Sequence, residues 1–222
     1  MLVQKMNNIK PEFNPEDMYH MFDIKRLHND IWYFKNVLSY PKELLTFINE
    51  IDNIEESHKS ISKWEPWTAS DDKSFVYGKN KNISLSNFEN KNNRLSQKML
   101  YIKNSLEMAF DMCLKQYLSG HRLDPAMYNL KINEIPVRQW VGPGMGPHCD
   151  TYDGDNDLAF SMIAYINEDY EGGEIAFPNH NISLKPAAGS LVIFPSHEPF
   201  LHQVKDIVSG ERYTSHLSVY KI

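Results

Sequence analysis

The chain has 222 residues, of which 41% are hydrophobic and 12% aromatic, and its formal net charge is −6. This length suits one domain, or one domain with a helical extension, and the apolar content is enough for a sizeable core. The acidic balance argues against a general nucleic-acid surface. With only two cysteines, no disulfide framework holds the fold.

No apolar run approaches the length that crosses a bilayer, and residues 1–10 lack the apolar segment of a signal peptide. We therefore expect a soluble, cytoplasmic protein of a reducing compartment, without a membrane or nucleic-acid partner. The sequence does not indicate an oligomeric state.

The N-terminal region predicts packing elements. Residues 1–30 are polar and mixed, which favours a partly ordered arm. Ile31–Phe34 predicts a short strand or hydrophobic anchor. Pro41 suits the first turn of a helix. The helix continues with an apolar stripe typical of a core contact, formed by Leu44, Leu45, Phe47, Ile48 and Ile51.

Residues 63–81 carry Trp64 and Trp67 but, unlike the helix before them, show no sustained hydrophobic period. Two interpretations stay open. The segment is either an ordinary excursion pinned by its tryptophans or a substrate loop, since functional loops sit on rigid scaffolds.

Arg94–Tyr117 has the strongest helical pattern, and Gly120 can end that helix. Its apolar residues recur three or four apart: Leu95, Met99, Ile102, Leu106, Phe110 and Cys113. We expect Met99 and Met108 to fill core space, and Cys113 to be inert on the apolar stripe.

From Tyr128 the period changes to that of strands, and Gly142–Pro147 is a turn-rich loop. Short strands without intervening helices imply an antiparallel sandwich or barrel. The strands expected after this loop are Leu158–Asn167, Glu174–Phe177, Asn181–Lys185, Ser190–Phe194, Phe200–Val204 and Arg212–Tyr220.

The expected fold is thus a mainly β core with α: a double-stranded β-helix of the jelly-roll or cupin type with N-terminal packing helices. We divide the chain into a support region, 1–127, and a second domain, 128–222.

A metal site is indicated by His148, Asp150 and His202. Side chains two apart in an extended strand share a face, so His148 and Asp150 can converge while Cys149 points away. Two imidazoles and one carboxylate leave open positions on a metal, as in non-haem Fe(II) oxygenases. The same ligands also suit a zinc hydrolase. A non-catalytic jelly-roll binding module is a further alternative.

The ordered set of His148-Cys149-Asp150, Gly172-Gly173, His202 and Arg212 resembles the prolyl 4-hydroxylase-like branch of the 2-oxoglutarate and Fe(II)-dependent dioxygenases. The resemblance covers roughly the last 90 residues, from near Leu130. The first half matches only loosely, although residues 63–81 lie where relatives keep a mobile substrate loop.

The resemblance implies that the catalytic and metal-binding residues are His148, Asp150 and His202, with Fe(II) as the metal. It also implies 2-oxoglutarate and O2 as cosubstrates, ascorbate as a reductant, and hydroxylation with release of succinate and CO2. The implied substrate is a peptide or protein, hydroxylated most readily at proline. Hydroxylation of a free small molecule is the alternative.

Arg212 shares a face of the last strand with Thr214 and His216. A buried arginine needs an anion, and its planar fork can grip a carboxylate through two hydrogen bonds. The resemblance implies that this anion is the distal carboxylate of 2-oxoglutarate. The alternative is a structural ion pair with Glu174 or Asp206.

Two further residues are assigned to cosubstrate binding by the resemblance, Tyr165 and Trp140. Tyr165 matches a position whose hydroxyl contacts the 2-oxoglutarate carboxylate in relatives, although a plain core tyrosine is an alternative. Trp140 and Ser218 depart from the family pattern, since relatives often carry tyrosine and tryptophan there. Ile175 replaces a commoner threonine.

Of the other histidines, His197 lies in a turn and is expected to be exposed. His216 is a candidate for a residue that orients a metal ligand or cosubstrate.

Overall fold

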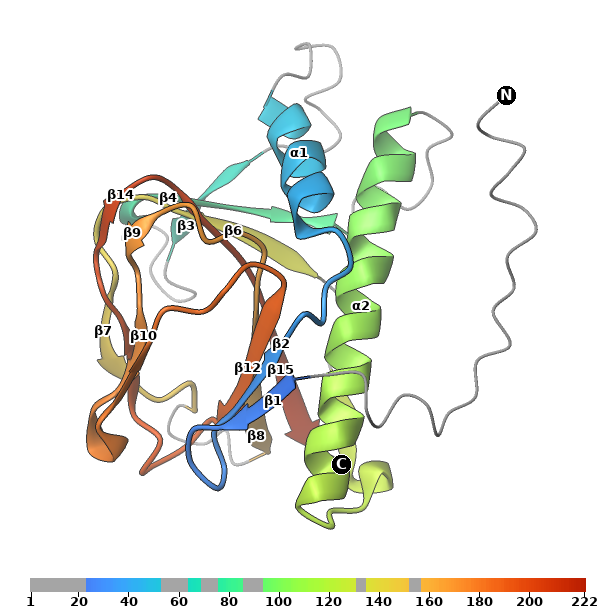
Figure 1. The fold of residues 1–222 in the computed structure, drawn as a ribbon, viewed down its shortest axis with the longest axis vertical. Helices are drawn as coiled ribbons and strands as arrows, with labels where there is room; N and C mark the ends of the chain where they lie inside the picture. The colour runs from blue at the N-terminus through green and yellow to red at the C-terminus, as the bar shows by residue number, and fades with distance from the viewer. Residues whose placement is uncertain (1–22, 53–63, 69–75, 86–93, 131–134, 152–156) are drawn as a thin grey trace, which may run out of the picture.

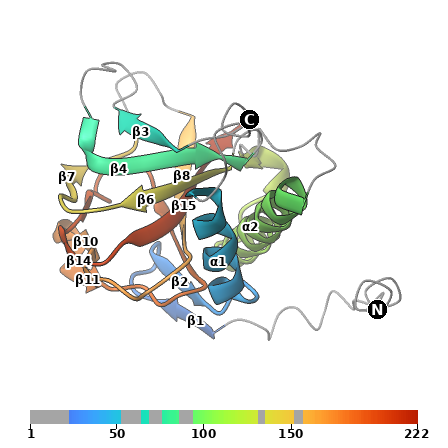
Figure 2. The same ribbon diagram turned by 90° about the horizontal axis from the view of Figure 1, so that it is seen from above.

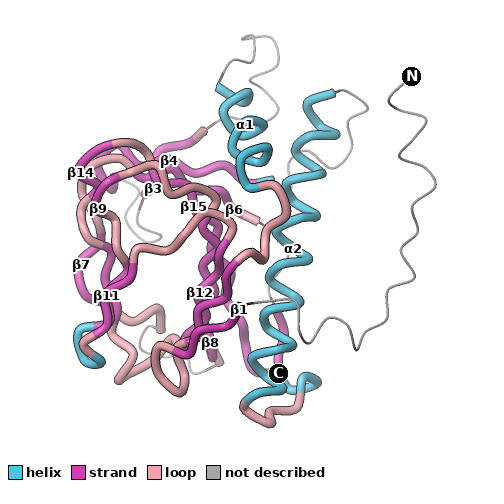
Figure 3. The backbone as a smooth tube through the Cα atoms, in the orientation of Figure 1, coloured by secondary structure: helices cyan, strands magenta, loops and turns pink. Residues whose placement is uncertain are grey.

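The computed structural model describes residues 23–52, 64–68, 76–85, 94–130, 135–151 and 157–222. Within these ranges, strands form one side of the molecule and two helices the other (Figures 1 and 3). The helices are α1 (Pro41–Asp52) and α2 (Arg94–Gly120), close to the predicted ranges. Neither helix combines the length and apolarity needed to span a membrane, among the residues described.

The large sheet of the described residues has nine antiparallel strands. Its order is β1 (Asp23–Arg26), β2 (Trp32–Lys35), β12 (Ser190–Pro195), β8 (Leu158–Tyr165), β15 (Arg212–Lys221), β6 (Pro136–Trp140), β4 (Val76–Ser84) and β3 (Glu65–Thr68), and β5 (Tyr128–Leu130) also pairs with β15.

A second sheet faces the first across the barrel (Figure 2), with the order β11 (Ile182–Leu184), β10 (Ile175–Phe177), β13 (His202–Val204) and β7 (Met145–His148). A third, two-stranded sheet is formed by β9 (Glu171–Gly172) and β14 (Ile207–Ser209). Two 3-10 turns, Pro125–Met127 and Pro178–His180, complete the described elements. The predicted mainly β jelly-roll with packing helices is confirmed.

Each strand predicted after residue 157 is present, within a few residues of its expected ends. Residues 1–30 were expected to form a partly ordered arm, and within it residues 23–26 form β1 and pair with β2. Residues 1–22 lie outside the described residues. Strands from both sides of residue 128 share the large sheet, since β2 pairs with β12 and β4 with β6.

The main core lies between α2 and the outer face of the large sheet (Figure 2). From α2 it receives Met99, Ile102, Leu106, Phe110 and Cys113, all 0% exposed. Burial raises the pKa of the Cys113 thiol, which disfavours the reactive thiolate. Met108 is 55% exposed, so its predicted place in the core is wrong. It lies about half a turn from Leu106, away from the sheet.

Within the segment 63–81, where the sequence shows no sustained period, β3 and β4 pair as a hairpin at the edge of the large sheet. The hydrophobic periodicity of the sequence does not indicate β3, because β3 is an edge strand that contains Pro66, and Glu65 and Pro66 are exposed. Both tryptophans do anchor it. Trp64 lies 6.3 Å from the ring of Tyr213, and Trp67 lies 4.7 Å from that of Trp140. Residues 69–75 lie outside the described residues.

The end of α2 depends on close contact between Gly120 and Trp32. A Cβ on Gly120 would lie 2.1 Å from Cη2 of Trp32. That indole is 1% exposed, and its Nε1 donates to the carbonyl oxygen of Asn29 at 2.7 Å. The ring therefore has no room to move aside.

We predict that Gly120→Ala lowers the free energy of unfolding by about 1–3 kcal/mol, the usual cost of overpacking a core. Gly146→Ala is the matched control, because a Cβ there meets nothing within 4 Å. Urea unfolding of both variants provides the measurement. Equal midpoints would show that the Gly120 contact does not constrain the fold.

Candidate metal centre

Three potential metal ligands meet where the second sheet ends. His148 closes β7, His202 opens β13, and the pairing of these strands sets the two histidines directly opposite each other. Their ring centroids are 4.3 Å apart. One ligand atom from each of His148, Asp150 and His202 lies within 4.8 Å of the other two. The predicted set therefore converges in space.

Asp150 reaches this position by a turn, not by strand parity. β7 ends at His148, and Asp150 follows in a bend. The backbone N–H groups of Asp150 and Thr151 both donate to the carbonyl oxygen of Ser196, at 3.1 Å each. The expectation of one extended strand through His148 and Asp150 is wrong, because the turn is bonded to the end of β12 instead.

The two imidazoles present suitable nitrogens. Nδ1 of His148 lies 2.8 Å from the carbonyl oxygen of Gly146, a contact that requires the proton on Nδ1 and frees Nε2. That Nε2 lies 3.6 Å from Oδ1 of Asp150, and Nε2 of His202 lies 3.7 Å from Oδ2. Burial lowers the pKa of His202 to about 4, so this imidazole is neutral near pH 7, as a metal ligand must be.

A chain of hydroxyl groups holds the carboxylate. Oγ of Ser161 donates to Oδ2 of Asp150 and lies 2.8 Å from Oγ of Ser196. Burial by itself raises the pKa of Asp150. The surrounding histidines, His216 first, and the Ser161 hydrogen bond outweigh it and hold this pKa below its usual value. Asp150 is thus a charged ligand with a fixed orientation.

His216 lies beside the same carboxylate, with its Nε2 3.8 Å from Oδ2 of Asp150. This Nε2 is buried and has no hydrogen-bond partner among the described residues. Burial lowers the pKa of His216 to about 4, so the ring is neutral near pH 7. His197, in contrast, is exposed, as expected, with its Nδ1 2.7 Å from the carbonyl oxygen of Glu198.

Arg212 is buried without a counter-ion. It is 1% exposed and faces Trp140 across the β15–β6 pair. Its Cζ lies 5.2 Å from the ring centroids of both Trp140 and Tyr165. Nε and Nη1 have no hydrogen-bond partner, and no carboxylate of the described residues forms an ion pair with it.

The alternative ion pair of Arg212 with Glu174 or Asp206 is therefore wrong. Asp206 instead accepts from the backbone N–H of Gly144, at 2.9 Å.

The residues around Arg212 are of two kinds: those that contact it only with a ring, and those with an unpartnered hydroxyl. Trp140 is of the first kind, since its Nε1 donates to Oγ1 of Thr214 at 3.0 Å and is not free to bind a ligand. Tyr165 is 0% exposed and its hydroxyl has no partner; the hydroxyl of Tyr170 is also buried and unpartnered, among the residues described. Ile175 is fully buried.

Sequence reasoning assigned no role to Ser161, Ser196 or Tyr170. Ser161 left a signal, as a serine inside the apolar strand Leu158–Tyr165 on the face of Tyr165. Ser196 and Tyr170 lie in turns, and only the folded chain shows what they touch.

Part of the chain is similar to a known protein family. Residues 136–219 match the model described as the 2OG-Fe(II) oxygenase superfamily. A PKHD-type hydroxylase of Prochlorococcus marinus (strain NATL2A) is 30% identical over 135 residues, 58% of this chain and 56% of that protein. One from strain NATL1A is 37% identical over 78 residues, 33% and 34% of the two chains. The chain thus spans about half or less of the length of these relatives.

Solved structures share the fold. A prolyl hydroxylase from Trichoplax adhaerens, in complex with a hypoxia inducible factor oxygen degradation domain peptide fragment, has a TM-score of 0.62. It is 16% identical, covering 88% of this chain and 85% of that one. A viral collagen prolyl hydroxylase from Paramecium Bursaria Chlorella virus-1, in its 2OG complex, has a TM-score of 0.55 at 16% identity, covering 86% and 96%.

We predict that Ser161→Ala weakens Fe(II) binding by about tenfold or more, the usual effect of removing a hydrogen-bond partner of a metal ligand. Ser215→Ala is the control. Ser215 is also fully buried in the large sheet, and its hydroxyl has no partner among the described residues. Anaerobic Fe(II) titration gives both affinities. Equal affinities would mean that Ser161 does not orient Asp150.

Proposed function

We propose that this chain, whose residues 136–219 belong to the 2OG-Fe(II) oxygenase superfamily in its prolyl 4-hydroxylase-like branch, hydroxylates a substrate with Fe(II), 2-oxoglutarate and O2. The observation that carries the proposal is Arg212, which is buried and has no ion-pair partner among the described residues, on the strand β15 whose His216 lies 3.8 Å from the Asp150 carboxylate. A metal site alone suits several reactions. A buried guanidinium with unsatisfied donors on a strand that reaches this site supports the binding of an anion as well.

The donor set fits Fe(II). His148, Asp150 and His202 would hold the metal on one side, and two imidazoles with one carboxylate are the ligands of non-haem Fe(II) oxygenases. When bound, Fe(II) and 2-oxoglutarate supply the activation of O2 and release succinate and CO2. Ser161 fixes the carboxylate, and the Gly146 carbonyl fixes the tautomer of His148. These contacts set the ligand geometry before the metal arrives.

The groups around Arg212 fit the cosubstrate. Nε and Nη1 of Arg212 can donate in parallel to the two oxygens of a carboxylate, and the Tyr165 hydroxyl can add a further donor. Trp140 closes one side of the guanidinium with its ring. Because these residues are 0–3% exposed, they would hold the distal carboxylate of 2-oxoglutarate away from water.

Two alternatives have less support. A zinc hydrolase would use the same ligands with a water, but Arg212 has no task in such a reaction. A non-catalytic binding module has no need of three converging ligands whose carboxylate is held by hydrogen bonds. Ascorbate as a reductant stays a prediction.

We predict that Arg212→Met costs about 2–4 kcal/mol of 2-oxoglutarate binding, through loss of a bidentate charge-assisted contact. This equals a rise of roughly 30- to 1,000-fold in Kd, while Fe(II) affinity stays unchanged. Arg122→Met, at an exposed turn, is the control. Anaerobic calorimetry measures both ligands. Equal loss of both affinities would assign Arg212 a structural role instead.

We infer that the substrate is a peptide or protein, hydroxylated at proline. Support comes from the relatives, which are prolyl hydroxylases or PKHD-type hydroxylases, one of them in complex with a peptide fragment. The hairpin of β3 and β4 also lies beside the site, since Trp67 contacts Trp140 and the guanidinium of Arg138 lies 4.6 Å from the Trp67 ring. The described part of the segment 63–81, the hairpin of β3 and β4, is therefore the proposed substrate side.

We predict that proline-containing peptides support 2-oxoglutarate-dependent succinate formation and gain one oxygen by mass, whereas free L-proline does not. An extended peptide needs a groove and backbone partners, while a free amino acid also needs groups that neutralise both of its charges. His148→Ala gives the background rate. Turnover of free proline alone would contradict the peptide assignment.

A further inference from the structure

Tyr170 and Arg212 both lie next to Gly173 in the Gly172-Gly173 turn. Gly173 has a φ of 67°, and a Cβ on it would lie 3.0 Å from Cε2 of Tyr170 and 3.2 Å from Cδ of Arg212. The same Cβ would lie 2.4 Å from Cδ1 of Ile207. Tyr170 and Arg212 therefore both pack against a glycine that has room for no side chain of its own.

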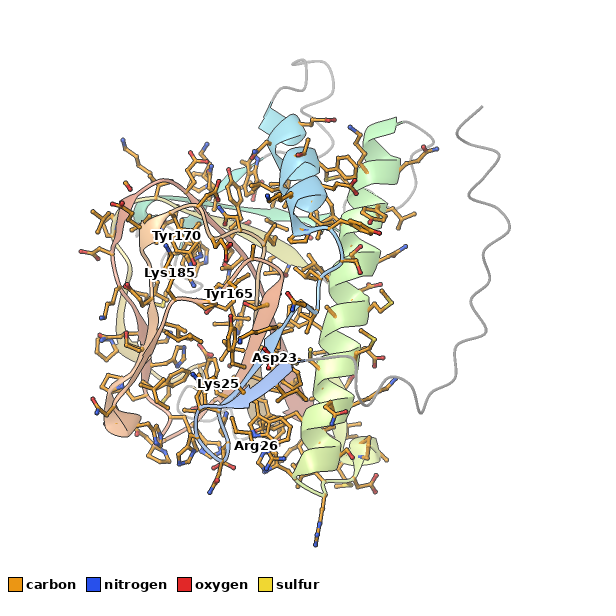
Figure 4. All side chains as sticks on the ribbon, viewed as in Figure 1. Asp23, Lys25, Arg26, Tyr165, Tyr170 and Lys185 are labelled. Atoms are coloured by element: carbon orange, nitrogen blue, oxygen red, sulfur yellow. The ribbon has the colours of Figure 1, made fainter. Side chains whose placement is uncertain are left out.

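Contacts on its other side fix the Tyr170 ring. Nζ of Lys185 donates to the carbonyl oxygen of Tyr170 and lies 4.9 Å from the ring centroid. Trp140, Val204 and Ile207 pack in the same cluster. Figure 4 shows Tyr170 and Lys185 together at the end of the barrel that holds β9, with Tyr165 nearby. Tyr170 is 3% exposed, so its orientation is set by packing.

The Tyr170 hydroxyl is nevertheless buried without a partner among the described residues. A buried hydroxyl without a hydrogen bond destabilises the fold, and a phenylalanine would avoid that cost. Burial raises the pKa of Tyr170, against the opposing effect of the Arg212 charge, so the hydroxyl keeps its proton near pH 7. The group is a neutral donor beside a cation.

We propose that the Tyr170 hydroxyl is a third donor group to the distal carboxylate of 2-oxoglutarate, together with Arg212 and Tyr165. This inference rests on the proposed function. The unpartnered donor atoms are Nε and Nη1 of Arg212 and the two tyrosine hydroxyls. A carboxylate offers about four acceptor positions, so one carboxylate satisfies all of them. Gly173 is then required because it lets two of the three donor groups approach each other.

The test compares 2-oxoglutarate with 2-oxopentanoate, which keeps the 2-oxo acid and chain length but lacks the distal carboxylate. Anaerobic calorimetry with Fe(II)-loaded protein should show that Tyr170→Phe weakens 2-oxoglutarate binding about tenfold, the effect of one hydrogen bond to a charged group. Affinity for 2-oxopentanoate should change less than about twofold, since no hydrogen bond to it is lost.

Thermal unfolding adds a readout that a structural role would not give. Without ligand, Tyr170→Phe should match or exceed wild type in Tm, because it removes an unsatisfied hydroxyl, while the rise in Tm on adding 2-oxoglutarate should shrink. Tyr213→Phe is the control. Its hydroxyl is bonded to Gln139 and Glu211 and its ring lies in the helix-facing core, so it should lower Tm without changing 2-oxoglutarate affinity.

Unchanged 2-oxoglutarate affinity in Tyr170→Phe would overturn the inference, and so would equal weakening of both 2-oxo acids with a lowered Tm. Failure of wild type to bind 2-oxoglutarate at all would instead overturn the proposed function. The two failures are therefore distinguishable.

Discussion

The structure depends on burying both faces of β15. On one face, Leu217 and Val219 belong to the core that includes α2. On the other, Arg212, Thr214 and His216 look into the barrel, next to β6 and β8. Because helices cover the outer face, the strand cannot turn its charged residues to water. The barrel must therefore satisfy a guanidinium and an imidazole in its interior.

The barrel satisfies these polar groups only in part, and the unsatisfied donors are the physical basis for assigning a ligand. The chain provides ring contacts to Arg212 but no anion among its described residues, and it leaves the hydroxyls of Tyr165 and Tyr170 unpartnered. Such a site is costly when empty and is stabilised by the ligand that completes it. The metal ligands differ, since Asp150 is already held by Ser161 and by the surrounding histidines. In the proposed function, the metal centre is therefore organised in advance, while the anion site is completed by its occupant.

The sequence predicted those features that depend on local periodicity. The stripe of α2 and the alternation along β15 are one-dimensional patterns, so the buried positions of Leu106 and Arg212 followed from them. The order of His148, Asp150 and His202 was sufficient to select residues that do converge. Strand parity was the wrong reason for Asp150, because the geometry comes from a turn bonded to Ser196.

The features that were missed depend on long-range contacts. β3 lacked a strand signal because it is a half-exposed edge strand that contains Pro66. Its pairing with β4 is a contact between two segments, which no local period of the sequence predicts. Ser161 and Tyr170 carry no local mark of the roles that we assign to them, since Ser161 bonds to a carboxylate eleven residues away and Tyr170 packs, like Arg212, against Gly173. Met108 was misplaced because a methionine in a helix was assigned to the core without regard to its face.

The central claim is that His148, Asp150 and His202 hold Fe(II) while Arg212 binds the far end of a 2-oxo acid chelated to it. Visible absorption under anaerobic conditions tests this most directly. Wild-type protein with Fe(II) and 2-oxoglutarate should develop the weak charge-transfer band of the chelate, and Asp150→Ala should not. Absence of the band from wild type, or its persistence in Asp150→Ala, would contradict the account.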